Sequence, residues 1–140
     1  MAKVEKPEGT LAQILVVDDD RDFLGAVENA LRFDERFADC DVLTAVDGNE
    51  AINQYNEHEP EVVILDLMLP KRSGFLVFED IERGKGRMDL PHVVMVTGNI
   101  GSRHKAYAGS LGVDDYLHKP CRMEKLMDVV NGYVKDVARG

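Results

Sequence analysis

Short apolar runs alternate with amphipathic stretches along most of the chain. The run at residues 62–65 is apolar at every position, which is typical of a strand buried on both faces of a parallel sheet. Mostly apolar runs at 13–17, 42–46 and 92–98, together with the short segment 115–118, predict four further strands. The pattern therefore predicts a sheet of five strands.

Between the strands, apolar residues recur at the spacing of one helix face. The stripe Phe23, Leu24, Val27 and Leu31 predicts a helix after the first strand. Further helices are expected around residues 51–55, 75–81, 102–111 and 126–137. Residues 33–39 fit either the frayed end of the first helix or a loop. Each predicted strand is thus followed by one predicted helix.

This regular alternation implies an α/β fold, with a parallel sheet covered by helices on both faces. Right-handed crossovers and short connections favour the doubly wound, flavodoxin-like strand order 2-1-3-4-5. We expect residues 13–138 to form this single domain and residues 1–12 to be a loose tail. Ligands of such sheets bind beyond the carboxyl ends of the strands, at the switch point between strands one and three.

Polar residues stand at the carboxyl ends of four predicted strands. They are Asp18 and Asp19 after the first strand, Asp66 after the third, Thr97 and Gly98 at the end of the fourth, and Lys119 after the fifth. Any one of them has an ordinary explanation: an aspartate caps a helix, a threonine ends a strand, and a lysine is solvated. Their coincidence at one edge of the sheet predicts a binding site.

The chemistry of these groups points to a metal and a phosphoryl group. Two carboxylates 4 Å apart repel each other by about 4 kcal/mol at an effective dielectric constant near 20. Mg²⁺ relieves this repulsion and prefers oxygen ligands. Lys119 can bind a phosphoryl oxygen, Thr97 can donate its hydroxyl, and Gly98 leaves room for the group. A carboxylate such as Asp66 beside Mg²⁺ is also a competent nucleophile for phosphoryl transfer.

Composition excludes several classes of protein. The net charge of −9 argues against direct nucleic-acid binding, and no apolar run is long enough to span a membrane. The first ten residues do not resemble a signal peptide, so a cytoplasmic location is expected. Cys40 and Cys121 lack metal-site spacing and are expected to be reduced, unpaired thiols. The four histidines are scattered and predict no metal site.

From Ile14 to about Val137 the chain resembles the receiver domain of bacterial response regulators, the CheY-like family of two-component systems. The matching stretches are Ile14–Asp20, Thr44–Ala51, Leu65–Pro70 with Gly74, Val96–Gly98 and Gly112–Pro120. Five such motifs in this order, each on the expected strand or turn, form a specific signature. The resemblance implies a phospho-acceptor signalling switch, not an enzyme, with no more than self-phosphotransfer and autodephosphorylation of its own.

The resemblance also implies a role for each site residue. Asp66 would accept a phosphoryl group from the phosphohistidine of a sensor histidine kinase or phosphotransfer protein. Asp19, Asp66 and the backbone carbonyl of Met68 would hold Mg²⁺, and Asp18 would act mainly through a bound water. Lys119 would contact the phosphoryl group, beside Gly98.

A coupled movement would relay the phosphorylated state. Thr97 would shift toward the phosphoryl group and Tyr116 would turn inward to fill the space that Thr97 leaves. The surface of the fourth helix, fifth strand and fifth helix would change with them, and it is where family members bind partners or dimerise. Met68 and Asn99 would tune the lifetime of the phosphoryl group. The downstream effector domain or protein stays unidentified.

Some positions depart from the family pattern or leave alternatives open. Cys121 replaces an apolar residue, and Arg122 stands where a helix-capping residue is frequent. The basic segment 83–90 fits either a partner contact or a loop. The Lys119–Pro120 bond can be cis or trans.

Two other functions fit parts of the pattern. One is a phosphohydrolase with Asp66 as nucleophile. Such enzymes of the haloacid-dehalogenase type carry a second acid two residues later, where this chain has Met68. The other is a receiver-like interaction module that is never phosphorylated.

Overall fold

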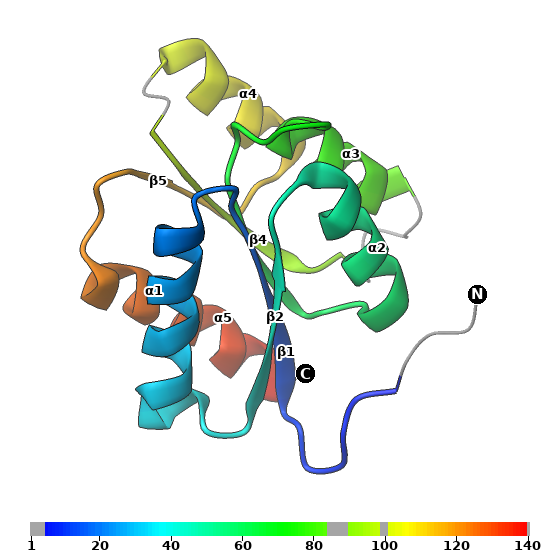
Figure 1. The fold of residues 1–140 in the computed structure, drawn as a ribbon, viewed down its shortest axis with the longest axis vertical. Coiled ribbons are helices and arrows are strands. Elements are labelled where there is room, and N and C mark those ends of the chain that lie inside the picture. Colours follow the sequence, from blue (N-terminus) through cyan, green and yellow to red (C-terminus); the bar gives the residue numbers. More distant parts are fainter. Residues whose placement is uncertain (1–4, 84–89, 99–100, 140) are drawn as a thin grey trace.

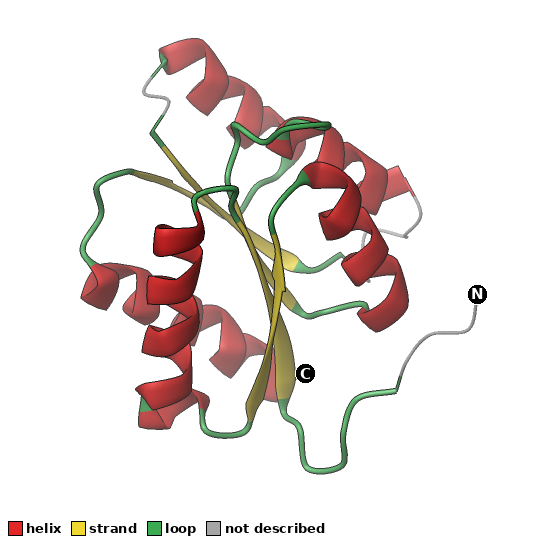
Figure 2. Ribbon diagram, in the orientation of Figure 1, coloured by secondary structure: helices red, strands yellow, loops and turns green. Residues whose placement is uncertain are grey.

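The computed structural model describes residues 5–83, 90–98 and 101–139. Five parallel strands form one sheet in the order β2-β1-β3-β4-β5 (Figures 1 and 2). The strands are β1 (Ala12–Val17), β2 (Cys40–Ala45), β3 (Val62–Leu65), β4 (His92–Thr97) and β5 (Asp115–His118). The predicted α/β fold and its strand order are therefore confirmed.

In the described parts of the chain, five α-helices connect and cover the strands. They are α1 (Arg21–Phe33), α2 (Gly48–His58), α3 (Gly74–Arg83), α4 (Ser102–Leu111) and α5 (Met123–Arg139). Figure 1 shows α1 and α5 on one side of the sheet and α2 and α3 on the other. Right-handed crossovers on both sides are what an alternating α/β chain requires.

The sheet separates two apolar cores because successive residues of a strand point to opposite faces. Ile14 and Val16 of β1 pack with Leu31 of α1 and Val130 of α5. Leu15 and Val17 pack on the opposite face, with residues of α2 and α3. All four residues of β3 are buried, as its continuous apolar run predicts.

Residues 33–39 differ from both structures expected for them. A short 3₁₀ helix, η1 (Glu35–Phe37), follows α1, with Asp34 between the two. The carboxylate of Asp34 accepts from the backbone N–H of Arg36, and Phe37 is buried in the core beneath α1. A side-chain cap and one buried aromatic residue are sufficient to hold this single turn.

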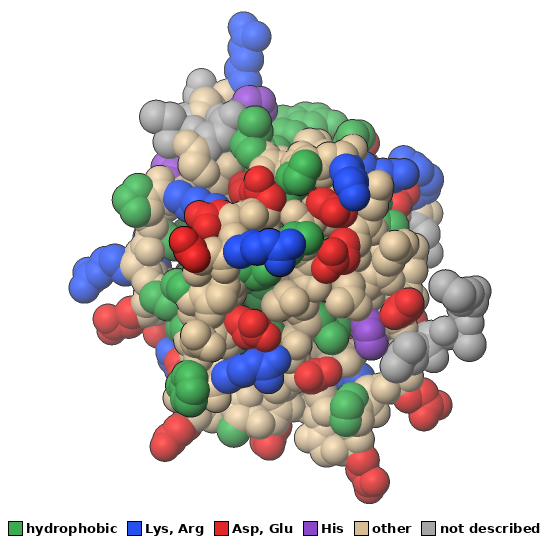
Figure 3. All heavy atoms as spheres, viewed as in Figure 1, with side chains coloured by type: hydrophobic (Ala, Val, Ile, Leu, Met, Phe, Trp, Pro, Cys, Tyr) green, Lys and Arg blue, Asp and Glu red, His purple; other side chains and the backbone are tan. Residues whose placement is uncertain are grey.

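Among the described residues no helix is both long and apolar enough to cross a lipid bilayer. Acidic and basic side chains are interspersed over the face shown in Figure 3, and no continuous basic stripe appears there. Of the basic segment at 83–90, residues 84–89 lie outside the described residues. The expectation for that segment therefore stays a prediction.

Cys40 and Cys121 form no disulfide, as predicted, and both thiols are half-buried. Burial is the main cause that raises the pKa of each thiol above its ordinary value. Because only the thiolate reacts, we expect iodoacetamide at pH 8 to alkylate both at least about threefold more slowly than an unstructured cysteine peptide. Peptide mass spectrometry measures the rates, and unfolding in guanidinium should abolish the protection. Native labelling as fast as the peptide's would contradict the expectation.

Candidate functional site

The polar residues at the strand ends are held by backbone hydrogen bonds that extend the sheet. The Asp18 N–H donates to the Ala45 carbonyl at 3.1 Å, and the Asp66 N–H donates to the Val17 carbonyl at 3.0 Å. On the other side of β4, the Lys119 N–H donates to the Thr97 carbonyl at 2.9 Å. The side chains therefore start from backbone positions as well defined as the strands themselves.

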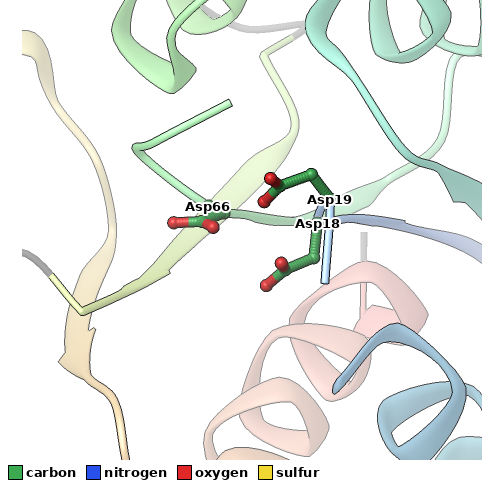
Figure 4. Close-up of side chains that lie close together, drawn as sticks. All are labelled: Asp18, Asp19 and Asp66. Carbon is green, nitrogen blue, oxygen red and sulfur yellow. The ribbon is translucent and has the colours of Figure 1, made fainter. Parts of the chain in front are cut away.

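Three of these side chains converge. Asp18, Asp19 and Asp66 each place a carboxylate oxygen within 4.8 Å of the others, and the side chains of Asp18 and Asp19 point toward Asp66 (Figure 4). Asp18 and Asp66 are buried, whereas Asp19 is exposed. A set of carboxylate oxygens open to solvent on one side fits Mg²⁺, which keeps several waters when bound to protein. The residues therefore suit the metal that their chemistry predicts.

Lys119 is the cation nearest to this cluster among the ion pairs of the described residues. Its Nζ donates to Asp18 Oδ2 at 2.6 Å and lies 3.6 Å from Asp66 Oδ2. Burial alone would lower the pKa of Lys119, but the hydrogen bond to Asp18 and the charges of Asp66 and Asp18 outweigh it and raise the pKa. Lys119 therefore stays charged and neutralises part of the cluster.

The effects on the pKa of Asp66 balance differently from those on the pKa of Lys119. Burial, and next the charge of Asp18, raise the pKa of Asp66. Lys119, the backbone N–H of Met68 and the hydroxyl of Thr97 act in the opposite direction and do not cancel the rise. The Met68 N–H donates to Asp66 Oδ1 at 3.2 Å. The Asp66 carboxylate is thus desolvated and oriented, as a nucleophile must be.

The loop after Asp66 packs tightly against two glycines. A Cβ on Gly74 would overlap the carbonyl oxygen of Asp66, and a Cβ on Gly48 would lie 2.5 Å from both Cβ and the carbonyl oxygen of Arg72. The Gly48 N–H also donates to the Pro70 carbonyl at 3.3 Å. These contacts fix the loop that carries Met68. Gly48 and Gly74 both lie in stretches that resemble the family, but the sequence alone does not show that Gly48 contacts this loop.

Of the three adjacent aspartates, Asp20 has the capping role that its position suggests. It is the N-cap of α1, and its carboxylate accepts from the backbone N–H groups of Asp22 and Phe23. Its own N–H donates to Asp18 Oδ1 at 2.9 Å. Asp20 therefore orients the first turn of α1 relative to the acidic cluster.

The residues expected to relay the signal lie on β4 and β5. Thr97 is fully buried at the end of β4, and Tyr116 is half-buried on β5. Burial, and next the charge of Asp66, raise the pKa of Tyr116. Gly98 is exposed, with open space where a Cβ would be.

Two further expectations concern neighbouring positions. Asn99 lies outside the described residues, so its expected influence on the phosphoryl lifetime stays a prediction. The Lys119–Pro120 peptide bond is cis.

Comparison with known proteins adds a family match and a shared fold to this description. Residues 14–131 match the family model of the response regulator receiver domain. A CheY-like receiver domain protein from Methanospirillum hungatei JF-1 has the same fold, with a TM-score of 0.78, 22% identity, and coverage of 93% of this chain and 98% of that one.

Response regulator DrrB of Thermotoga maritima, an OmpR/PhoB homologue, is also similar. It is 29% identical with a TM-score of 0.74, and the match covers 89% of this chain and 52% of DrrB. The BeF3-activated receiver domain of DrrB is 29% identical with a TM-score of 0.76, and 89% of this chain and 97% of that one are covered.

Proposed function

Because this chain belongs to the response regulator receiver domain family, we propose that Asp66 is its phosphorylation site. A partner histidine kinase or phosphotransfer protein would transfer the phosphoryl group to it. Receiver domains are regulatory switches, and the observation that carries the assignment is the position of Asp66. Its carboxylate is desolvated beside Asp18 and lies 3.6 Å from Lys119 Nζ.

In the proposed transfer, a carboxylate oxygen of Asp66 attacks the phosphorus of a phosphohistidine. The new P–O bond forms an acyl phosphate, and the P–N bond breaks with its electron pair returning to the histidine ring. Lys119 is close enough to contact the phosphoryl oxygens, and its charge favours the negative charge that gathers on them. Thr97, already hydrogen-bonded to Asp66, can donate its hydroxyl to the same group.

Asp19, Asp66 and the Met68 carbonyl would hold Mg²⁺, with Asp18 acting through a water. When bound, Mg²⁺ would offset the charge of the carboxylates and the phosphoryl oxygens. The loop after Asp66 packs tightly against Gly48 and Gly74. This packing supports the Met68 carbonyl as a metal ligand, because a fixed loop holds a ligand in place.

We further propose that Thr97 and Tyr116 relay the phosphorylated state to the surface of α4, β5 and α5. The support is that Thr97 contacts Asp66 and that the charge of Asp66 acts on Tyr116. Dimerisation through that surface, the control of lifetime by Met68 and Asn99, and the identity of the effector stay predictions, as does the cytoplasmic location.

Incubation with Mg²⁺ and acetyl phosphate tests the assignment. We expect intact-mass analysis to show one added phosphoryl group, and chelation of Mg²⁺ before incubation to prevent it. Sustained release of phosphate from phosphate esters would instead indicate a phosphohydrolase. No adduct with acetyl phosphate or with a panel of phosphorylated histidine kinases would indicate an interaction module that is never phosphorylated.

A further inference from the structure

The Lys119 ammonium has a third neighbour besides the two carboxylates. Its Nζ lies 4.3 Å from the centroid of the Phe23 ring, over the face of the ring. This separation is well inside the roughly 6 Å over which a ring face attracts a cation. The negative face of the aromatic ring thus adds to the attraction of Asp18 and Asp66.

The position of Phe23 follows from the start of α1. Asp20 caps the helix and accepts from the Phe23 N–H at 3.3 Å, which places Phe23 in the first turn. Leu24 and Val27 of the same stripe are buried in the core, whereas Phe23 is only half-buried. Its ring therefore covers Lys119 at the edge of the core. An aliphatic residue could supply the same packing, but it would not attract the cation.

We propose that Phe23 is a positioning residue that holds the Lys119 ammonium between Asp18 and Asp66 and so sets the rate at which Asp66 is phosphorylated. The inference rests on the proposed function of Asp66. A ring face attracts a cation without accepting a second strong hydrogen bond, so it restrains Lys119 without neutralising it as another carboxylate would. Phe23 acts through Lys119 and is not itself a catalytic residue.

Stepwise fluorination of Phe23 separates this role from packing. Site-specific incorporation of mono-, di- and trifluorophenylalanine weakens the negative ring face while nearly preserving the ring's size. We expect the rate of phosphorylation by acetyl phosphate at saturating Mg²⁺ to fall with each fluorine, by about fivefold in total. Phe23→Leu should lower the phosphorylation rate by about the same factor, and Phe23→Tyr should keep a rate close to the native one.

Two controls make the rate series specific. The same fluorinated residues at Phe33, at the other end of α1 and 86% exposed, should leave the rate unchanged. In a Lys119→Met background, fluorination of Phe23 should leave the phosphorylation rate unchanged. A flat series in the native background, or an equal decline in the Lys119→Met background, would overturn the inference.

NMR of the ¹⁵N-labelled Lys119 ammonium gives a readout that needs no phosphorylation. We expect its mobility to increase with each fluorine on Phe23, and an unchanged signal across the series would refute the positioning role. If the native protein takes up no phosphoryl group, the function proposed for Asp66 fails. The ammonium mobility alone then decides whether Phe23 holds Lys119.

Discussion

Asp66→Asn is expected to take up no phosphoryl group from acetyl phosphate, whereas the native protein takes up one. Asparagine keeps the shape of the side chain but replaces the nucleophilic carboxylate oxygen by a neutral amide. Intact-mass analysis measures the difference. The matched control is Asp22→Asn, which removes an exposed carboxylate in the first turn of α1 and should be phosphorylated normally. An adduct of undiminished yield on Asp66→Asn would show that another residue is the acceptor.

The same substitution should change the free energy of unfolding with a defined pH dependence. Burial and Asp18 raise the pKa of Asp66 above 3.8, so the folded protein disfavours the ionised carboxylate. With divalent cations chelated, Asp66→Asn should therefore be more stable than the native protein above the raised pKa. The gain should shrink as the pH falls through that pKa and vanish below 3.8, where the carboxyl is protonated in both states. Thermal unfolding of both proteins across this pH range measures the gain in stability.

Lys119→Met is expected to slow phosphorylation of Asp66 by about a hundredfold, because the transition state loses a preorganised cation beside the phosphoryl oxygens. Methionine preserves much of the side-chain volume. The rate with acetyl phosphate at saturating Mg²⁺ measures the loss. Lys125→Met, an exposed lysine in the first turn of α5, is the matched control and should be phosphorylated at the native rate.

Removal of Lys119 should also make the protein depend on Mg²⁺ for stability. Asp18 is 1% exposed and would lose its partner at 2.6 Å, which leaves buried carboxylates facing each other. We expect about 2 kcal/mol of destabilisation without Mg²⁺, less than for a fully enclosed pair because Lys119 is partly exposed. Mg²⁺ should recover more stability in the variant than in the native protein. Equal Mg²⁺ stabilisation of both would contradict the role of Lys119 as counter-charge.

The sequence was sufficient to predict the acidic cluster because topology brings it together. Asp18 and Asp66 each follow an apolar run, and parallel strands that neighbour each other bring their carboxyl ends to one edge of the sheet. The register of Val17 with Leu65 then brings the two carboxylates together. Patterning therefore predicts a site best when each of its groups is attached directly to a strand end.

Contacts made by loops and helix ends were harder to predict. Phe23 reads as one more apolar residue of a helical stripe, and periodicity does not reveal that its ring lies over Lys119. Gly48 reads as part of a turn. Its close approach to Arg72 is not apparent from the sequence, because the two residues belong to segments that are distant along the chain. The 3₁₀ turn at Glu35–Phe37 has no signal in the sequence pattern, because a single capped turn has no periodicity of its own.

The shortness of β5 restricts how other chains can associate with this edge of the sheet. As the last strand in the order, it pairs only with β4 among the described residues, and it spans only Asp115–His118 with an ionisable residue at each end. Short, charged edge strands resist backbone pairing with a second sheet. A partner that binds this side of the molecule must therefore contact the side chains of α4, β5 and α5. Non-specific aggregation through strand pairing is correspondingly disfavoured.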